Sequence, residues 1–179
     1  ASICVQTGTT TELNLTDHHF GKMAWGRETG NQNYDTKIAE KVFNRAFLSL
    51  LERTKSLTFD EIWFVVGNDL FNSDDVEGRT TKGTYVSTDV RYQKTFGVVR
   101  TLMVGAIEEL RKRTEKVKVI LVSGNHDQLS VWHLGDSLEC YFHKYADVDI
   151  DNEPKYRKYH RFGAVMIMYT HGDKGKRLD

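Results

Sequence analysis

Two runs of apolar, β-forming residues alternate in this chain with two long stretches of helical periodicity, and this alternation constrains the fold most. The apolar runs are residues 61–66 (EIWFVV) and 117–123 (VKVILVS). Residues 35–54 and 89–115 place apolar side chains at the three- and four-residue spacing of amphipathic helices. Strands that alternate with helices are joined by crossovers and form a largely parallel sheet. The sequence therefore predicts an α/β fold.

Further elements are expected on both sides of this central pattern. A third helix is expected over residues 130–145, with Leu129 and Trp132 on its buried face. Short strands are expected at residues 2–7, 12–16, 148–150, 156–160 and 165–170. The strand pairs at the two ends suggest antiparallel additions, so we expect a mixed, largely parallel sheet flanked by helices. A chain of 179 residues is long enough for one domain, which we assign to residues 1–179.

Polar residues that can bind metal follow four of the expected strands. The four clusters are Asp17-His18-His19, Gly67-Asn68-Asp69, Gly124-Asn125-His126-Asp127 and His171-Gly172-Asp173. In open α/β sheets, ligands bind outside the carboxyl ends of the strands. Imidazole and carboxylate together suit manganese, iron, nickel or zinc better than calcium. The sequence therefore predicts a metal site at this end of the sheet.

Two residues of these clusters have roles that follow from chemistry alone. A carboxylate that reaches two ions can bridge a pair about 3.5 to 4 Å apart, as in phosphatases and nucleases. Asp69 is our candidate for this bridge. A histidine beside the ions that is not itself a ligand can protonate the leaving oxygen of a phosphoester. His126 is our candidate for this catalytic acid.

The motifs resemble, in order, those of the calcineurin-like metallophosphoesterases. That family has Asp-x-His, then Gly-Asp, then Gly-Asn-His-Asp/Glu, then a histidine and a final Gly-His-x-His. The resemblance implies an αββα sandwich and two divalent ions, with manganese expected and iron, nickel or zinc as alternatives. It also implies that Asp17 and His19 bind the first ion, that Asn125 binds the second, and that His171 is a further ligand.

The second and the last motifs depart from the family pattern. Gly67-Asn68-Asp69 has one residue more than Gly-Asp, so Asn68 could occupy the bridging position instead of Asp69. We prefer Asp69 because Leu70-Phe71 follows it, as in the Gly-Asp-Leu-Phe that is common in the family. The final Gly-His-x-His is absent from these 179 residues, which suggests a chain truncated before that motif. Such a piece is expected to bind metal weakly and to turn over slowly or not at all.

Residues outside the motifs are assigned to substrate and support roles. Two long polar stretches, residues 20–34 and 72–88, are expected to be loops near the strand ends. Arg27, Arg79 and Lys82 on these loops are candidates for gripping a phosphate, with an ordinary solvated loop as the alternative. Asp127 is expected to orient a neighbouring ligand.

Three functions remain open at this point. The long loop after the first motif and the Gly-Asp-Leu-Phe-like second motif are similar to those of SbcD-like nuclease subunits, which implies a phosphodiesterase acting on DNA. Lysine plus arginine and aspartate plus glutamate number 25 each, and zero net charge mildly favours a phosphomonoesterase or a small-nucleotide phosphodiesterase. A scaffold that keeps the fold without catalysis is the third possibility.

Cysteine usage and hydropathy bear on the compartment. Cys4 and Cys140 each lie in an apolar-periodic segment, which predicts buried thiols and a reducing, cytoplasmic environment. No run approaches the roughly 20 apolar residues that span a bilayer, and the N-terminal residues lack the pattern of a signal peptide. We therefore expect no membrane partner.

Overall fold

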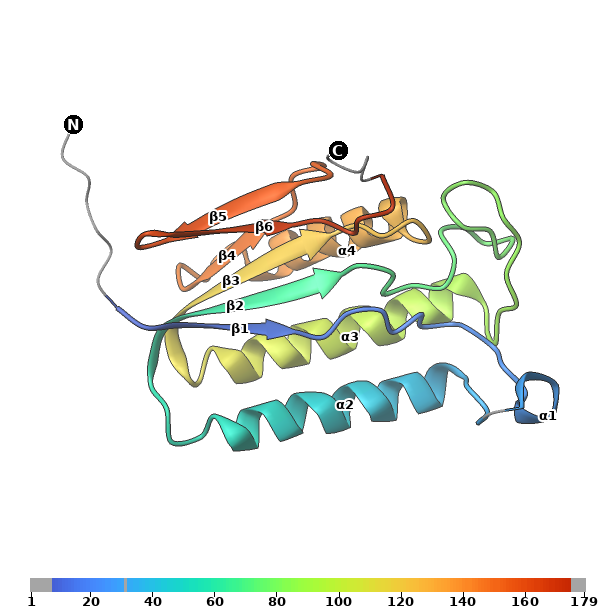
Figure 1. Ribbon diagram of the computed structural model, residues 1–179, viewed down its shortest axis with the longest axis horizontal. Coiled ribbons are helices and arrows are strands. Elements are labelled where there is room, and N and C mark those ends of the chain that lie inside the picture. The colour runs from blue at the N-terminus through green and yellow to red at the C-terminus, as the bar shows by residue number, and fades with distance from the viewer. Residues whose placement is uncertain (1–7, 31, 175–179) are drawn as a thin grey trace, which may run out of the picture.

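The centre of the computed structural model, which describes residues 8–30 and 32–174, is a four-stranded parallel sheet (Figure 1). Its strands are β1 (Thr10–Asn14), β2 (Phe59–Gly67), β3 (Thr114–Val122) and β4 (Val148–Asp151). Their order in the sheet is β1-β2-β3-β4, the same as their order in the chain. The predicted α/β class with a parallel sheet and flanking helices is confirmed.

Three long helices cover one face of this sheet. They are α2 (Thr36–Arg53), α3 (Tyr92–Leu110) and α4 (Gln128–Phe142). A further helix, α1 (Gly26–Thr29), is a single turn. Right-handed crossovers that all advance in the same direction across a sheet place their helices on the same face. Accordingly, Phe43 of α2, Ile107 of α3 and Leu134 of α4 belong to one buried core with Phe64 of β2 and Val119 of β3.

An antiparallel hairpin covers the other face. It consists of β5 (Lys158–Phe162) and β6 (Val165–Tyr169), drawn in red above the parallel sheet in Figure 1. Tyr169 packs there with Trp63 of β2 and Ile120 of β3. The hairpin is a separate two-stranded sheet, so the prediction that it would add antiparallel strands to the central sheet is wrong. The strand expected at residues 2–7 lies outside the described residues.

The buried face of α4 differs from the one expected. Its buried apolar residues are Val131, Leu134, Leu138 and Phe142, which follow one another at three- and four-residue intervals. This stripe turns Leu129 and Trp132 outward, where they are 54% and 39% exposed. Cys140 is also exposed, so the prediction that it is a buried thiol is wrong, and Cys4 lies outside the described residues.

The two long polar segments lie together at the carboxyl ends of the strands. The backbone of Met23 in the first segment donates to Ser87 O in the second, at 3.2 Å, and Lys22 is bridged to Thr88. The first segment also contains α1, which was not expected. No helix within residues 8–30 and 32–174 is both long and apolar enough to cross a membrane.

Candidate metal centre

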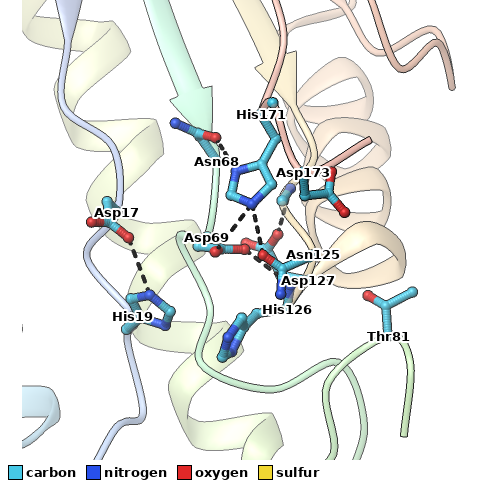
Figure 2. A network of polar contacts seen from close by, with 12 residues as sticks. Asp17, His19, Asn68, Asp69, Thr81, Asn125, His126, Asp127, His171 and Asp173 are labelled. Atoms are coloured by element: carbon cyan, nitrogen blue, oxygen red, sulfur yellow. Dashed lines mark hydrogen bonds and ion pairs between the residues drawn. The ribbon is translucent and has the colours of Figure 1, made fainter. Parts of the chain in front are cut away.

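The polar residues that follow β1, β2, β3 and β6 converge around one buried carboxylate (Figure 2). We call them the strand-end cluster, which comprises Asp17, His19, Asn68, Asp69, Asn125, His126 and His171. Asp69 is 5% exposed and lies at the centre of the cluster. The parallel strands β1, β2 and β3 end at the same edge of the sheet, and the hairpin strand β6 ends beside them, which is why residues more than 150 positions apart in the sequence converge here.

The backbone of the cluster is strained. Asp17, His19, Asn68 and Asp69 have positive φ angles of 65°, 46°, 53° and 63°, and no other non-glycine residue in the described ranges has one. Left-handed backbone is unfavourable for side chains with a Cβ, and such residues concentrate at functional sites. Asp17 N and His19 N donate to Asn68 O and Asp69 O, each at 3.0 Å, so the two strained segments hold each other.

The first group of the cluster consists of Asp17, His19 and His126 beside Asp69. Possible ligand atoms of His19, Asp69 and His126 all lie within 4.8 Å of one another. The backbone N of His126 donates to Asp69 Oδ1 at 2.9 Å. The ring Nδ1 of His126 lies 2.8 Å from Asn72 O, so Nε2 is the ring nitrogen that is not engaged by Asn72. The rings of His19 and His126 meet edge to face with centroids 4.6 Å apart.

His19 is suited to act as a neutral ligand. Its Nδ1 is buried without a hydrogen-bond partner, and its Nε2 lies 3.1 Å from Asp17 Oδ1. Burial, helped by the neighbouring His126, lowers the pKa of His19. A histidine with a lowered pKa is uncharged at neutral pH, which is the form that binds a metal.

The second group consists of Asn68, Asn125 and His171 on the other side of Asp69. His171 Nε2 lies 2.7 Å from Asn125 Oδ1 and 3.5 Å from Asp69 Oδ2, and its Nδ1 contacts Asn68 Oδ1. The carboxylate of Asp69 thus lies between the two groups, within ligand distance of His19 and His126 on one side and 3.5 Å from His171 on the other, while its Oδ1 accepts from the backbone of His126. Asn68 meets only the far nitrogen of His171. Of the two residues considered for the bridge, Asp69 is the one placed between the groups.

Asp127 ties together the two loops that carry these groups. Its carboxylate is fully buried and accepts hydrogen bonds from Gly124 N and Phe71 N, both at 2.9 Å. Burial raises the pKa of Asp127 to about 7. A Cβ on Gly124 would lie 1.9 Å from Asp69 Oδ1, so only glycine allows the loops to approach this closely.

The basic residues expected to grip substrate are not joined to the cluster. Arg79 pairs with Asp75 and Glu77, each at 2.7 Å, and Arg27 lies 5.8 Å from the ring centroid of Trp25. Lys82 lies 3.6 Å from Asp173, two residues after His171. In the described part of the chain none of the three contacts a cluster residue. A phosphate would have to compete with the carboxylates for Arg79.

His18 lies between two residues of the cluster in the sequence but is not part of it. Its ring packs against Phe20 and Phe43, with centroids 5.7 and 5.4 Å away, and burial lowers its pKa. This histidine therefore belongs to the core and points away from Asp69.

Asp74 organises the site and was missed in the sequence. It accepts hydrogen bonds from Leu129 N at 3.1 Å and from Ser130 N at 2.7 Å, and so caps α4 from a distant loop. Thr81 O–H donates to Asp74 at 2.6 Å, and its oxygen accepts from Gln128 N at 3.1 Å. The sequence gives no signal for this role, because Asp127 precedes α4 as a local cap would, and only the structure shows that its carboxylate is engaged elsewhere.

The donor set of the cluster fits divalent transition metals. Two imidazoles and a carboxylate with mutual distances below 4.8 Å match the ligand preferences of manganese, iron and zinc. The partnerless buried Nδ1 of His19 is an orphan that a bound ion would satisfy. Comparisons with protein-family models, with curated proteins and with solved structures found no match to this chain.

Proposed function

We propose that this chain is a metal-dependent phosphoesterase domain of the calcineurin-like type that hydrolyses phosphodiesters, DNA among them. The observation that supports this most is the position of Asp69, whose carboxylate lies within ligand distance of His19 and His126 and also 3.5 Å from His171. A carboxylate in this position could bridge a pair of ions, the arrangement by which two-metal sites stabilise the attacking and leaving oxygens of a phosphoester. The clustering of four strained residues, Asp69 and three neighbours, is a second, independent support.

In this proposal the two groups hold two ions, with manganese as the expected metal. Asp17 and His19 serve the first ion, Asn125 and His171 the second, and Asp69 serves both. When bound, the ions would polarise the phosphate and provide a hydroxide nucleophile near neutral pH. Asp127 positions the ligands by fixing the loop of Asn125 against the loop of Asp69.

His126 is the proposed acid of the reaction. Asn72 O accepts from its Nδ1, and this contact fixes the tautomer and directs Nε2 away from the backbone. In the imidazolium form the ring carries a second proton on Nε2, and this proton would pass from Nε2 to the leaving oxygen of the ester. His126 also lies within ligand distance of His19 and Asp69, so a role as a ligand is the competing assignment.

The finer fold assignment belongs to the same proposal. In an αββα sandwich two sheets face each other between two helical layers, and β5–β6 would belong to the second sheet. Its position against the face of the parallel sheet that the helices leave free is consistent with this.

The test is hydrolysis by the purified chain with manganese. We expect release of nitrophenol from bis-p-nitrophenyl phosphate, shortening of single-stranded DNA, and little action on p-nitrophenyl phosphate. His126→Ala should abolish turnover while retaining metal binding in calorimetry, whereas His143→Ala, which changes an exposed histidine, should leave both unchanged.

Each competing function predicts a different result. Cleavage of the monoester alone would replace the diesterase by a phosphomonoesterase. Loss of manganese binding in His126→Ala would make His126 a ligand. Absence of manganese binding in the unaltered chain would favour a scaffold and contradict the proposal.

A further inference from the structure

A cavity of about 560 Å³ opens beside the second group of the strand-end cluster. Its walls include Ser123, which lies two residues before Asn125, and Lys174, which lies three residues after His171. Two residues of extended chain span about 7 Å. The wall at Ser123 therefore begins within about 7 Å of Asn125 along the chain, and the volume of the cavity falls in the range of small-molecule sites.

Aromatic side chains form two of its walls. Trp132 of α4 lines the cavity and is 39% exposed, and Tyr156 lines it from the segment that follows β4. The hydroxyl of Tyr156 donates to Asp173 at 3.0 Å and accepts from Lys174 N at 2.8 Å. The ring of Tyr156 is thus fixed to the segment that carries His171, so this wall of the cavity cannot shift independently of His171, the proposed metal ligand.

The opposite wall is held equally firmly. Asn152 lines the cavity, and its amide donates to Trp132 O at 3.1 Å. A Cβ on Gly135 would lie 2.0 Å from Asn152 Oδ1, so the residue 152 segment rests directly on α4. The cavity is therefore bounded by elements in fixed contact, and it is preformed.

The charges and polar groups around the cavity suit a nucleotide. Lys155, Lys174 and one acid, Glu153, line it; Lys155 pairs with Glu153, which leaves Lys174 as the lysine outside that pair, and Lys174 Nζ lies 5.0 Å from the centroid of the Tyr156 ring. Gln128 and Asn152 add amide groups that can hydrogen-bond to the edge of a base. Aromatic faces bind bases of any sequence by stacking.

We infer that this cavity binds the nucleoside bonded to the scissile phosphate, with its base against Trp132, so that the substrates are nucleotide phosphodiesters. The inference rests on the proposed phosphoesterase function and adds a substrate class to it. A base in this cavity would place its phosphate toward Asn125 and His171, the nearest members of the cluster.

Two diesters with the same leaving group test the inference. The p-nitrophenyl ester of thymidine 5′-monophosphate carries a base, and methyl p-nitrophenyl phosphate does not. With manganese, the unaltered chain should show a higher kcat/KM for the nucleotide ester. In Trp132→Ala, the ratio of the two kcat/KM values should fall about tenfold, mainly through the KM for the nucleotide ester, because stacking of a base contributes about 1–3 kcal/mol.

Control variants separate stacking from general damage to the helix. Tyr141→Ala removes an exposed aromatic residue of α4 that does not line this cavity, and it should leave the ratio unchanged. Trp132→Phe keeps an aromatic face and should retain most of the preference. An unchanged ratio in Trp132→Ala, or a phosphopeptide hydrolysed in preference to the nucleotide ester, would overturn the inference.

A binding measurement keeps the inference testable if neither ester is hydrolysed. Thymidine 5′-monophosphate should quench the tryptophan fluorescence of the unaltered chain but not that of Trp132→Phe, whose remaining tryptophans are Trp25 and Trp63. Quenching without hydrolysis would reject the phosphoesterase proposal and retain the nucleotide site. Hydrolysis without fluorescence quenching and without a preference for the nucleotide ester would retain the phosphoesterase proposal and reject the nucleotide site.

Discussion

The two groups around Asp69 differ in how their ligand atoms are engaged. In the first group His19 Nδ1 is buried without a partner, and the backbone at Asp17 and His19 is left-handed. In the second group both nitrogens of His171 contact the side-chain oxygens of Asn68 and Asn125. Both groups contain strained backbone, since Asn68 is left-handed too, but only the first has a buried ligand atom without a partner, whereas the ligand atoms of the second contact one another.

This difference predicts unequal affinities for two ions. An ion entering the first group satisfies a buried atom that would otherwise lack a partner. An ion entering the second group must first separate His171 from Asn125, which form a 2.7 Å contact. The first group should therefore bind metal more tightly than the second, although Asp69 serves both.

The largest effect is expected from removing the carboxylate of Asp69, which the two groups share. Asp69→Asn keeps the shape of the side chain and tolerates the positive φ. We expect both manganese-binding steps to weaken and hydrolysis to fall by at least about a hundredfold, because an ion contributes several kcal/mol to phosphoryl transfer. Metal content and kcat are the measurements.

Asn68 provides the matched control for this variant. Asn68→Gly also suits positive φ and should weaken binding less, because Asn68 contacts only the far nitrogen of His171. If Asn68→Gly abolished manganese binding while Asp69→Asn retained it, Asn68 would be the bridging residue, and the assignment of residues to the two groups would be wrong.

Separate removal of one ligand from each group tests the inequality itself. Manganese titration of the unaltered chain should show two steps in calorimetry. His19→Ala should weaken the tighter step, and His171→Ala the weaker one. Supporting residues of metal sites alone change affinity by about 10- to 100-fold, so each loss should be at least of that size. Equal effects of the two variants on both steps would contradict the comparison.

Gly124 sets how closely the two groups approach. In Gly124→Ala the new Cβ would meet Asp69 Oδ1 at 1.9 Å and Asp69 N at 2.4 Å. Overpacking of this kind lowers the free energy of unfolding by about 1–3 kcal/mol, and it should also displace Asp69 and weaken both binding steps.

The control is Gly105→Ala in the middle of α3, where a Cβ has nothing within 4 Å. Alanine is the better helix former there by up to about 1 kcal/mol, so this variant should be slightly more stable than the unaltered chain. Urea unfolding of the two variants gives both values. A stable Gly124→Ala protein with normal metal binding would show that the loops can separate without consequence.

The pH dependence of stability tests the role of Asp127, whose buried carboxylate joins the loops that carry the two groups. Burial raises the pKa of Asp127 from 3.8 to about 7. Between these values the folded chain holds a proton that the unfolded chain has released, so the free energy of unfolding of the metal-free protein should fall as pH rises through this window. The free energy of unfolding should fall by about 1.4 kcal/mol for each unit by which the pKa of Asp127 differs between the folded and the unfolded chain.

Asp127→Asn removes this titration and should flatten the profile measured by urea unfolding. The amide can accept only one of the two hydrogen bonds from Gly124 N and Phe71 N, so the variant should be less stable at low pH. An equally steep profile in the variant would assign the pH dependence to other groups.

The parallel sheet and its polar edge could be predicted because each signal is local. The apolar runs of β2 and β3 and the helical spacing of α2 and α3 are properties of short windows, and parallel strands bring their ends to one edge without further information. The convergence of Asp17, Asp69 and Asn125 follows from this topology, whereas the position of His171 depends on how the separate hairpin β5–β6 packs on the sheet.

The exposure of Trp132 and the role of Asp74 could not be predicted in this way. Several helical faces contain apolar residues in α4, and only the packing of Val131 and Leu134 against the sheet decides which one is buried. Asp74 caps α4 across 56 positions of sequence, and spacing patterns do not register contacts of that range. Likewise, the pairing of Arg79 with Asp75 and Glu77 depends on the path of a loop.

The long-range cap on α4 also orders the assembly of the molecule. Until Asp74 reaches Ser130, the first turn of α4 lacks acceptors for its free N–H groups, and closing that loop carries an entropic penalty that local structure does not offset. The loop can close only after β2 and β3 have paired, because the two segments extend from the ends of these strands. The helix start, the Trp132 wall and the loop of Asn125 should therefore become ordered together and late in folding, as one cooperative unit that hydrogen exchange would detect.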